Sequence, residues 1–273
     1  MTAVTFFIAR ESYHPTVLER KAERLRRETG NPNLRSKLDS GLTKKQVFMQ
    51  AIIRPTKMLL FSPIVLLLSL YMAVVYGYLY LLFTTITSVY ERSYGWNSGI
   101  AGLSFLGIGI GMFMGLFAFA ATSDRLVARL IAKNKSERKP EYRLPIMMVG
   151  ALFVPIGLFW YGWSAEKHLH YVMPIIGTGF VGCGLILTFM PISVYLVDAF
   201  TMYAASAMAA NTVLRSLVGA FLPLAGPKMY TALGLGWGNS TLGFIALALW
   251  PVSLLFYVYG ERIRTSKRFA VTF

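Results

Sequence analysis

The sequence predicts an all-α polytopic membrane protein with six transmembrane helices. Six stretches, each with at least 22 residues between its bounding charged residues, contain no charge except Arg215. Each stretch is longer than the roughly 20 apolar residues that cross a bilayer. Hydrophobic residues make up 55% of the 273-residue chain and charged residues only 14%, whereas a soluble domain averages about 25% charged residues.

The positive charge is concentrated on alternate loops. The chain carries 27 Lys and Arg against 12 Asp and Glu, a formal net charge of +15. Most basic residues precede the first stretch, lie between residues 124 and 143, or follow the last stretch. The positive-inside rule then places these segments and both termini in the cytosol. The charge therefore indicates topology, and no nucleic-acid partner is expected.

Residues 1–57 are expected to form a cytosolic segment ahead of the membrane bundle. Residues 3–9 are apolar but too short to cross a bilayer, so they are interpreted as the remnant of a preceding helix. Leu18, Ala22 and Leu25 recur at helical spacing among charged residues, and Gly30 ends this amphipathic helix. The helix is expected to be either a solvated linker, or an attachment to anionic headgroups or a regulatory contact.

The six-helix transmembrane half-bundle is assigned to residues 58–260, and a basic cytosolic tail follows at residues 261–273. The third span begins at Pro145, because proline suits the first helical turn. It ends at Trp163, whose indole suits the membrane interface. The six spans are predicted at residues 59–86, 98–122, 145–163, 171–195, 202–225 and 241–259.

Glycine and proline patterns predict how these helices pack and bend. Gly107, Gly111 and Gly115 recur every fourth residue and predict close approach by a neighbouring helix. Residues 177–182 match G-x-G-x-x-G, but inside an apolar span this string is interpreted as a helix contact, not as a dinucleotide site. Prolines are expected to interrupt the third to sixth spans and bend them; these are Pro155, Pro174, Pro191, Pro223 and Pro251.

Arg215 is the most informative residue of the spans. It lies about 20 Å from the inner end of the fifth span, with Asn211 one helical turn before it. Charges inside the membrane are costly and usually functional. Arg215 is expected either to hold an anionic group or modulate a proton-carrying carboxylate, or to tie two helices together through carbonyl oxygens.

Four tyrosines of the first span lie on two opposite faces. Tyr71 and Tyr78 share one face, and Tyr76 and Tyr80 lie nearly opposite. One pair is a candidate for lining a substrate cavity, and the alternatives are a place in the aromatic belt at the membrane interface and helix packing. Thr188 and Tyr195 add polar groups in the fourth span.

Other polar residues give weaker signals. Asp198 follows the fourth span and is expected to cap the start of the fifth. His168 and His170 have no third ligand nearby, so no metal site is assigned. Because the spans contain one arginine and no acidic residue, no catalytic constellation is found. The protein is not expected to be an enzyme or to need a cofactor, and the lone Cys183 forms no disulfide framework.

Several runs of residues resemble one family. Residues 10–15 (RESYHP), 18–22 (LERKA) and 25–31 (LRRETGN) are similar to the central cytosolic linker of fungal major facilitator superfamily drug:proton antiporters of the multidrug/polyamine type. Residues 195–199 (YLVDA), 203–206 (YAAS) and 214–216 (LRS) resemble the junction of the tenth and eleventh helices of that family. Asp124, Arg125 and Arg129 resemble a degenerate form of its short-loop motif.

The resemblance implies that this chain is the carboxy-terminal half of such a transporter, with two inverted three-helix repeats. Its first and fourth spans would line the cavity, which nominates Tyr71, Tyr78, Thr188 and Tyr195, with Asn211 and Arg215 as further candidates. Asp124, Arg125 and Arg129 would engage the other half.

The function implied is proton-coupled efflux of drugs, polyamines or secondary metabolites through a fungal plasma membrane. Hydrophobic or cationic small molecules are the expected cargo, and the lipid bilayer and a second half-transporter or a homodimer are the expected partners. Two alternatives stay open: an inactive truncated fragment, and a membrane interaction protein that transports nothing.

Overall fold

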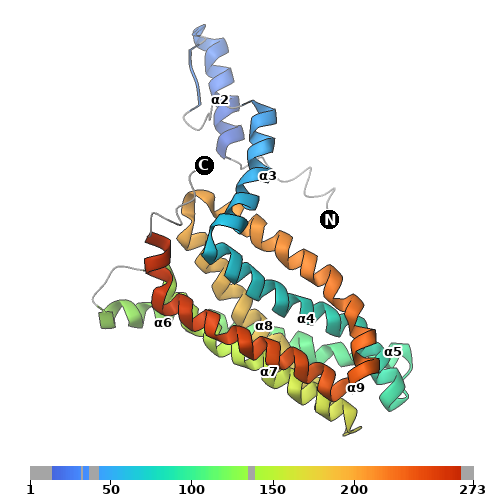
Figure 1. Ribbon diagram of the computed structural model, residues 1–273. Helices are drawn as coiled ribbons and strands as arrows, with labels where there is room; N and C mark the ends of the chain where they lie inside the picture. Colours follow the sequence, from blue (N-terminus) through green and yellow to red (C-terminus); the bar gives the residue numbers. More distant parts are fainter. Residues whose placement is uncertain (1–13, 32, 37–42, 135–138, 266–273) are drawn as a thin grey trace. The chain divides into compact units, whose positions relative to one another are not determined.

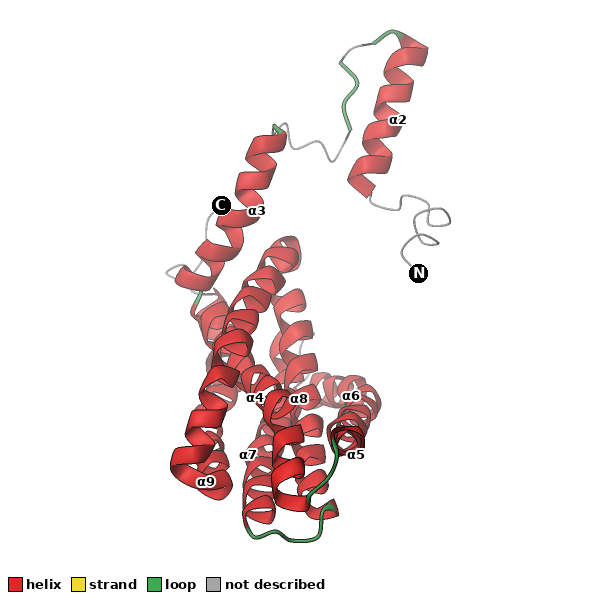
Figure 2. Ribbon diagram, turned by 90° about the vertical axis from the view of Figure 1, so that its right-hand side faces the viewer, coloured by secondary structure: helices red, strands yellow, loops and turns green. Residues whose placement is uncertain are grey.

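The structure is a computed structural model that describes residues 14–31, 33–36, 43–134 and 139–265. The predicted helix remnant at residues 1–9 and residues 266–273 of the basic tail lie outside the described residues. The described chain consists of helices joined by short loops (Figures 1 and 2). Its helices are α2 (His14–Thr29), α3 (Lys44–Phe61), α4 (Pro63–Tyr94), α5 (Ser98–Ala101), η1 (Gly102–Ser104), α6 (Phe105–Asn134), η2 (Pro140–Arg143), α7 (Leu144–Glu166), α8 (Val172–Ala199), η3 (Thr201–Tyr203) and α9 (Ala204–Thr265).

The chain divides into one unit of residues 1–52 and a second of residues 53–273. The first unit contains the predicted amphipathic helix, α2. Arg24 pairs with Glu28 at 2.7 Å and Arg26 pairs with Glu19 at 2.6 Å, and Gly30 follows the helix with φ 64°. The helix and its glycine end are confirmed, whereas its role as a linker or a lipid anchor stays a prediction.

The second unit contains five helical segments that are long and apolar enough to cross a membrane. The last of them includes α9, whose 62 residues exceed one crossing and are interrupted at Gly234 (φ 74°, ψ 175°). Figure 1 shows α9 reversing direction, so its first part (residues 204–233) and second part (residues 235–265) run in opposite directions. The two parts correspond to the fifth and sixth predicted spans, and the prediction of an all-helical membrane-spanning fold is confirmed.

The prolines do not break the helices where the sequence suggested. Pro155, Pro191, Pro223 and Pro251 lie inside continuous helices, and Pro174 lies in the first turn of α8. A proline removes one backbone donor and tilts the axis. The reversal of α9 occurs at Gly234, whose φ of 74° and ψ of 175° form a conformation that only glycine adopts readily. Gly234 lies between the predicted fifth and sixth spans.

The glycines of α6 form the predicted packing face. A Cβ atom at Gly107 would collide with the carbonyl oxygen of Ile175, and one at Gly111 with that of Gly179. At Gly115 an added Cβ would lie 2.8 Å from the Cys183 oxygen. All three contacts are with the backbone of α8, so only hydrogen fits at these positions.

The glycine string of α8 also makes helix contacts. A Cβ atom at Gly177 would lie 2.6 Å from the Tyr161 nitrogen of α7, and one at Gly182 would collide with the Ile108 oxygen of α6. The structure thus favours the packing interpretation of this string. Helix α8 lies between α6 and α7 and forms the centre of the bundle.

The interior of the bundle is unusually rich in tyrosine. The aromatic side chains with less than 2% of their surface exposed come from α4, α7, α8 and the second part of α9. A buried tyrosine fills volume like phenylalanine but needs a partner for its hydroxyl. The rings of this group are Tyr71, Tyr78, Tyr90, Tyr161, Tyr195 and Phe256.

Candidate functional site

Arg215 lies where α4, α8 and the first part of α9 meet. Its guanidinium carbon is 4.5 Å from the ring centroid of Tyr76 in α4 and 5.4 Å from that of Phe189 in α8. Its Nε is buried and has no hydrogen-bond partner. Ring faces therefore stabilise the cation. We call Arg215, Tyr76, Phe189 and Tyr80 the Arg215 cluster.

Tyr80 extends the aromatic surface of the cluster along α4. The rings of Tyr76 and Tyr80 lie 4.9 Å apart between centroids, and their hydroxyl oxygens are 3.3 Å apart. Gly219 follows Arg215 by one turn, and a Cβ atom there would lie 3.3 Å from the Tyr76 ring. The missing side chain leaves room for both rings beside α9.

Five of the predicted site residues carry enclosed polar atoms, namely Tyr71, Thr188, Tyr195, Asn211 and Arg215. The Asn211 amide oxygen, the Tyr195 hydroxyl and the Arg215 Nε are enclosed without a hydrogen-bond partner, and Asn211 and Tyr195 are at most 1% exposed. Tyr71 and Thr188 interact across the α4–α8 contact. Unpartnered buried polar atoms are uncommon and call for an explanation.

The other two predicted cavity tyrosines lie elsewhere in the core. Tyr78 donates a hydrogen bond from its hydroxyl to the Leu242 oxygen at 3.0 Å, which joins α4 to the second part of α9. Tyr195 is fully buried near Gly260 and Glu141. These placements favour packing for both, and a direct role in cargo binding stays a prediction.

The two faces of α4 thus have different surroundings. Tyr71 and Tyr78 are at most 1% exposed, whereas Tyr80 is 39% exposed and Tyr76 contacts Arg215. The structure brings Arg215 together with Tyr76 and Tyr80, the pair that the resemblance did not nominate.

A network of ion pairs joins the helices at the end of the bundle that carries η2, which we call the η2 end. Arg143 is 8% exposed, and its Nε donates to Asp198 Oδ2 at 3.2 Å. Its Nη1 donates to Ser123 Oγ at 2.9 Å and lies 3.6 Å from Asp124 Oδ1. One guanidinium therefore links η2 to α6 and α8.

A second set of pairs extends the network to the end of α9. Glu141 is 4% exposed, and its Oε1 accepts from Arg264 Nε at 3.1 Å. Lys139 Nζ lies 2.7 Å from Glu261 Oε2, and this hydrogen bond raises the pKa of Lys139. Residues 139–143 thus contact α6, α8 and the second part of α9.

One of the residues predicted in this region, Asp198, has a different role from the one expected. Asp198 lies in the last turn of α8, and the N-cap position of η3 is Phe200. Asp198 is therefore not the predicted cap but the acceptor of Arg143. Asp124 is mostly exposed and contacts Arg143, whereas Arg125 and Arg129 are exposed on α6, and their contact with another half stays a prediction.

Glu166 organises the opposite end of the bundle. Its Oε2 accepts from the backbone nitrogens of Leu235 at 2.7 Å and Gly236 at 3.3 Å. These donors begin the second part of α9, where the first turn has unsatisfied N–H groups and a positive dipole. Trp163 donates to Ser240 at 3.1 Å and fixes the same corner.

Four residues of these two ends were not nominated from sequence: Arg143, Glu141, Arg264 and Glu166. Each is a single charge next to a predicted span, where an interfacial charge is ordinary. No local spacing reveals their partners, because Glu141 and Arg264 are 123 residues apart in sequence. Arg143 lies two residues before Pro145, the first-turn proline of α7, and this position was the one available signal.

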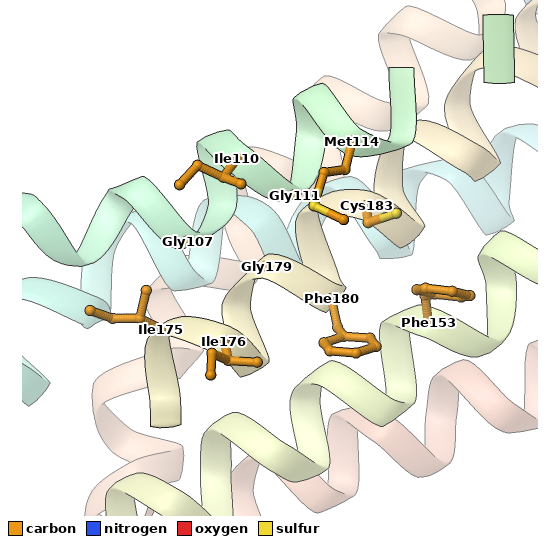
Figure 3. A pocket seen from close by; sticks show the side chains of 10 residues that line it. All are labelled: Gly107, Ile110, Gly111, Met114, Phe153, Ile175, Ile176, Gly179, Phe180 and Cys183. Carbon is orange, nitrogen blue, oxygen red and sulfur yellow. The ribbon is translucent and has the colours of Figure 1, made fainter. Parts of the chain in front are cut away.

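A separate apolar cavity of about 340 Å³ lies between α6, α7 and α8. Figure 3 shows Ile110 and Met114 of α6 facing Ile175, Phe180 and Cys183 of α8. None of the predicted site residues lines it. Its lining is apolar and contains no charged side chain.

Comparison with known proteins gives a family and its relatives. A family model described as Major Facilitator Superfamily matches residues 1–223. The chain is 63% identical over 273 residues to the MFS-type transporter penM of Penicillium rubens, covering all of this chain and 54% of that protein. No solved structure matches.

Other relatives include an efflux pump. The chain is 55% identical over 269 residues to the MFS transporter cpaT of Aspergillus oryzae, covering 98% of this chain and 54% of cpaT. It is 46% identical over 272 residues to the efflux pump radE of Floropilus chiversii, covering 99% and 51%. The chain spans about half the length of the curated relatives it matches.

Proposed function

We propose that this chain, which belongs to the major facilitator superfamily, supplies the carboxy-terminal half of a proton-coupled efflux carrier for small organic molecules. It is an integral multi-pass membrane protein of a transporter family. Its relatives are named as transporters, and radE is named as an efflux pump. The observation that carries the proposal is a match to these proteins over nearly the whole chain.

The structure supports a cargo-contacting surface at the Arg215 cluster. It combines a membrane-embedded cation, partly exposed rings and a buried amide in one region of α4, α8 and α9. Carriers of this type move cargo by rocking two halves around a site near the midplane. In this proposal the Arg215 cluster belongs to the wall that this chain contributes.

The η2 end is proposed to hold the helices together during that movement. Its pairs join α6, α8 and the second part of α9 through a few residues of η2. Asp124, Arg125 and Arg129 are proposed to engage the other half, which is either a second copy or a separate amino-terminal half. The plasma membrane is the proposed location, with the η2 end in the cytosol.

Transport can be tested in vesicles that contain the purified chain. We expect a membrane-permeable fluorescent dye to move against its gradient when a pH gradient is imposed, and to stop when a protonophore is added. Size-exclusion chromatography of the same sample would report a dimer if the chain transports as two copies. Dye movement equal to that of protein-free vesicles, from a monodisperse monomer, would favour a non-transporting protein.

A further inference from the structure

We infer that the Arg215 cluster binds the anionic group of an acidic aromatic or conjugated small molecule. This inference rests on the proposed function, because it names the class of cargo that such a carrier would take. It differs from the cationic cargo that the family resemblance implies.

The first argument is the charge balance of the spans. Arg215 is the one Lys or Arg within the six stretches, and these stretches contain no Asp or Glu. Arg143 and Arg264 each pair with a carboxylate, whereas Arg215 makes no ion pair among the described residues. A charge at this depth normally has a partner, and an anionic ligand would supply it, whereas a cationic ligand would add repulsion.

The second argument is the row of rings beside the guanidinium. Tyr76 and Phe189 place their faces against it, and Tyr80 and Phe83 continue the row along α4 with centroids 6.0 Å apart. Tyr80 and Phe83 are 39% and 40% exposed. A planar ligand can stack on these rings while its anionic group reaches Arg215.

The third argument is unmet hydrogen-bonding capacity. Asn211 lies one turn before Arg215 on the same face of α9, is 1% exposed, and has an amide oxygen without a partner. Arg215 Nε is also buried and unpartnered. If Arg215 only tied helices together, its donors would be expected to bond carbonyl oxygens. The Arg215 donor is thus left for the anionic group, and the Asn211 oxygen is left for a hydroxyl or N–H donor elsewhere on the ligand.

The test compares three probes that share one ring system. The full 273-residue chain in lipid nanodiscs is titrated with naphthalene-acetate, naphthalene-acetamide and naphthalene-methylammonium, and binding is measured by calorimetry. We expect the carboxylate to bind about tenfold tighter than the amide, which corresponds to one charge-assisted hydrogen bond. The ammonium is expected to bind most weakly.

Substitutions test whether Arg215 causes the preference for the carboxylate probe over the amide probe. R215Q is expected to abolish the preference for the carboxylate, and R215K to retain part of it because the charge remains. R92Q is the matched control, because Arg92 is an exposed arginine at the end of α4 and its loss changes the net charge equally. Y80L, at the exposed ring, is expected to weaken all three probes alike.

Two results would overturn the inference: equal binding of carboxylate and amide, or an equal loss of carboxylate binding in R215Q and R92Q. If R215Q does not fold, R215K and Y80L still test the inference through the ratio of carboxylate affinity to amide affinity. R215K must lower this ratio, and Y80L must leave it unchanged. Dye transport in vesicles is measured separately. Intact dye transport without a carboxylate preference overturns the cargo class alone, whereas a carboxylate preference without dye transport overturns the carrier function alone.

Discussion

Arg143 shows how one buried charge can hold three helices. Its guanidinium contacts Ser123 and Asp124 of α6 and Asp198 of α8. Asp198 lies in the last turn of α8, where the helix dipole is negative and a carboxylate alone is unfavourable. Arg143 therefore compensates both the carboxylate and the helix end.

Replacing Arg143 by Gln is expected to lower the free energy of unfolding by about 2 kcal/mol, because it leaves Asp198 uncompensated at a partly buried site. Arg143→Lys should recover only part of this, since lysine cannot contact Asp198 and Ser123 in the same fork geometry. Thermal unfolding in detergent measures the change. Arg125→Gln is the control, because Arg125 is exposed on α6; equal destabilisation by both would contradict the assigned role.

Glu166 is the residue whose loss should loosen the reversal of α9. Glu166→Ala removes the acceptor of the Leu235 and Gly236 nitrogens and is expected to cost about 1 to 2 kcal/mol, as the loss of a helix cap does. Glu166→Gln should cost less, because an amide oxygen still accepts a hydrogen bond. Hydrogen exchange of the Leu235 amide reports the effect locally. Unchanged exchange in Glu166→Ala would exclude the capping role.

The packing of α6 against α8 depends on positions without side chains. An added Cβ at Gly111 meets backbone atoms of Gly179, which cannot rotate away, whereas at Gly109 nothing lies within 4 Å. We expect Gly111→Ala to destabilise the bundle by about 1 to 3 kcal/mol through overpacking. Gly109→Ala should be neutral or slightly stabilising, because alanine favours helix. Paired thermal melts of the two variants provide the test, and similar melting temperatures would argue against the close contact.

The helices could be predicted from sequence, but their partners only in part. Apolar stretches indicate membrane helices locally, and the four-residue spacing of Gly107, Gly111 and Gly115 is visible within one helix. The predicted fifth and sixth spans leave residues 226–240 for the chain reversal, and Gly234 lies in that interval, but the several glycines there share the same local signal. Which tyrosine face of α4 meets Arg215 depends on how α4 packs against α9, and no local pattern contains that information.

The same limit applies to the charged residues of the whole molecule. Arg215 could be nominated from sequence as a candidate site residue, because a charge inside an apolar span is conspicuous by itself. Contacts between distant segments alone give Arg143, Glu141 and Arg264 their structural roles. Interfacial charges are so common in membrane proteins that sequence alone does not separate a structural pair from a solvated side chain.

The proposed topology of the whole molecule follows from two crossings by α9 and one by each of the other four membrane segments. It places exposed positions 133 and 262 on one side of the bilayer and exposed positions 92 and 167 on the other. The positive-inside rule assigns the first pair to the cytosol. Single cysteines can be introduced as Lys133→Cys, Arg262→Cys, Arg92→Cys and Lys167→Cys after Cys183→Ala removes the native thiol.

A membrane-impermeant maleimide applied to intact cells should label positions 92 and 167, and should reach positions 133 and 262 only after permeabilisation. Permeabilised cells, in which all four positions should react, control for accessibility of the thiols. Labelling of position 262 together with position 92 would mean that α9 does not cross twice. The membrane path proposed for residues 204–265 would then be wrong, and with it the placement of the Arg215 cluster within the bilayer.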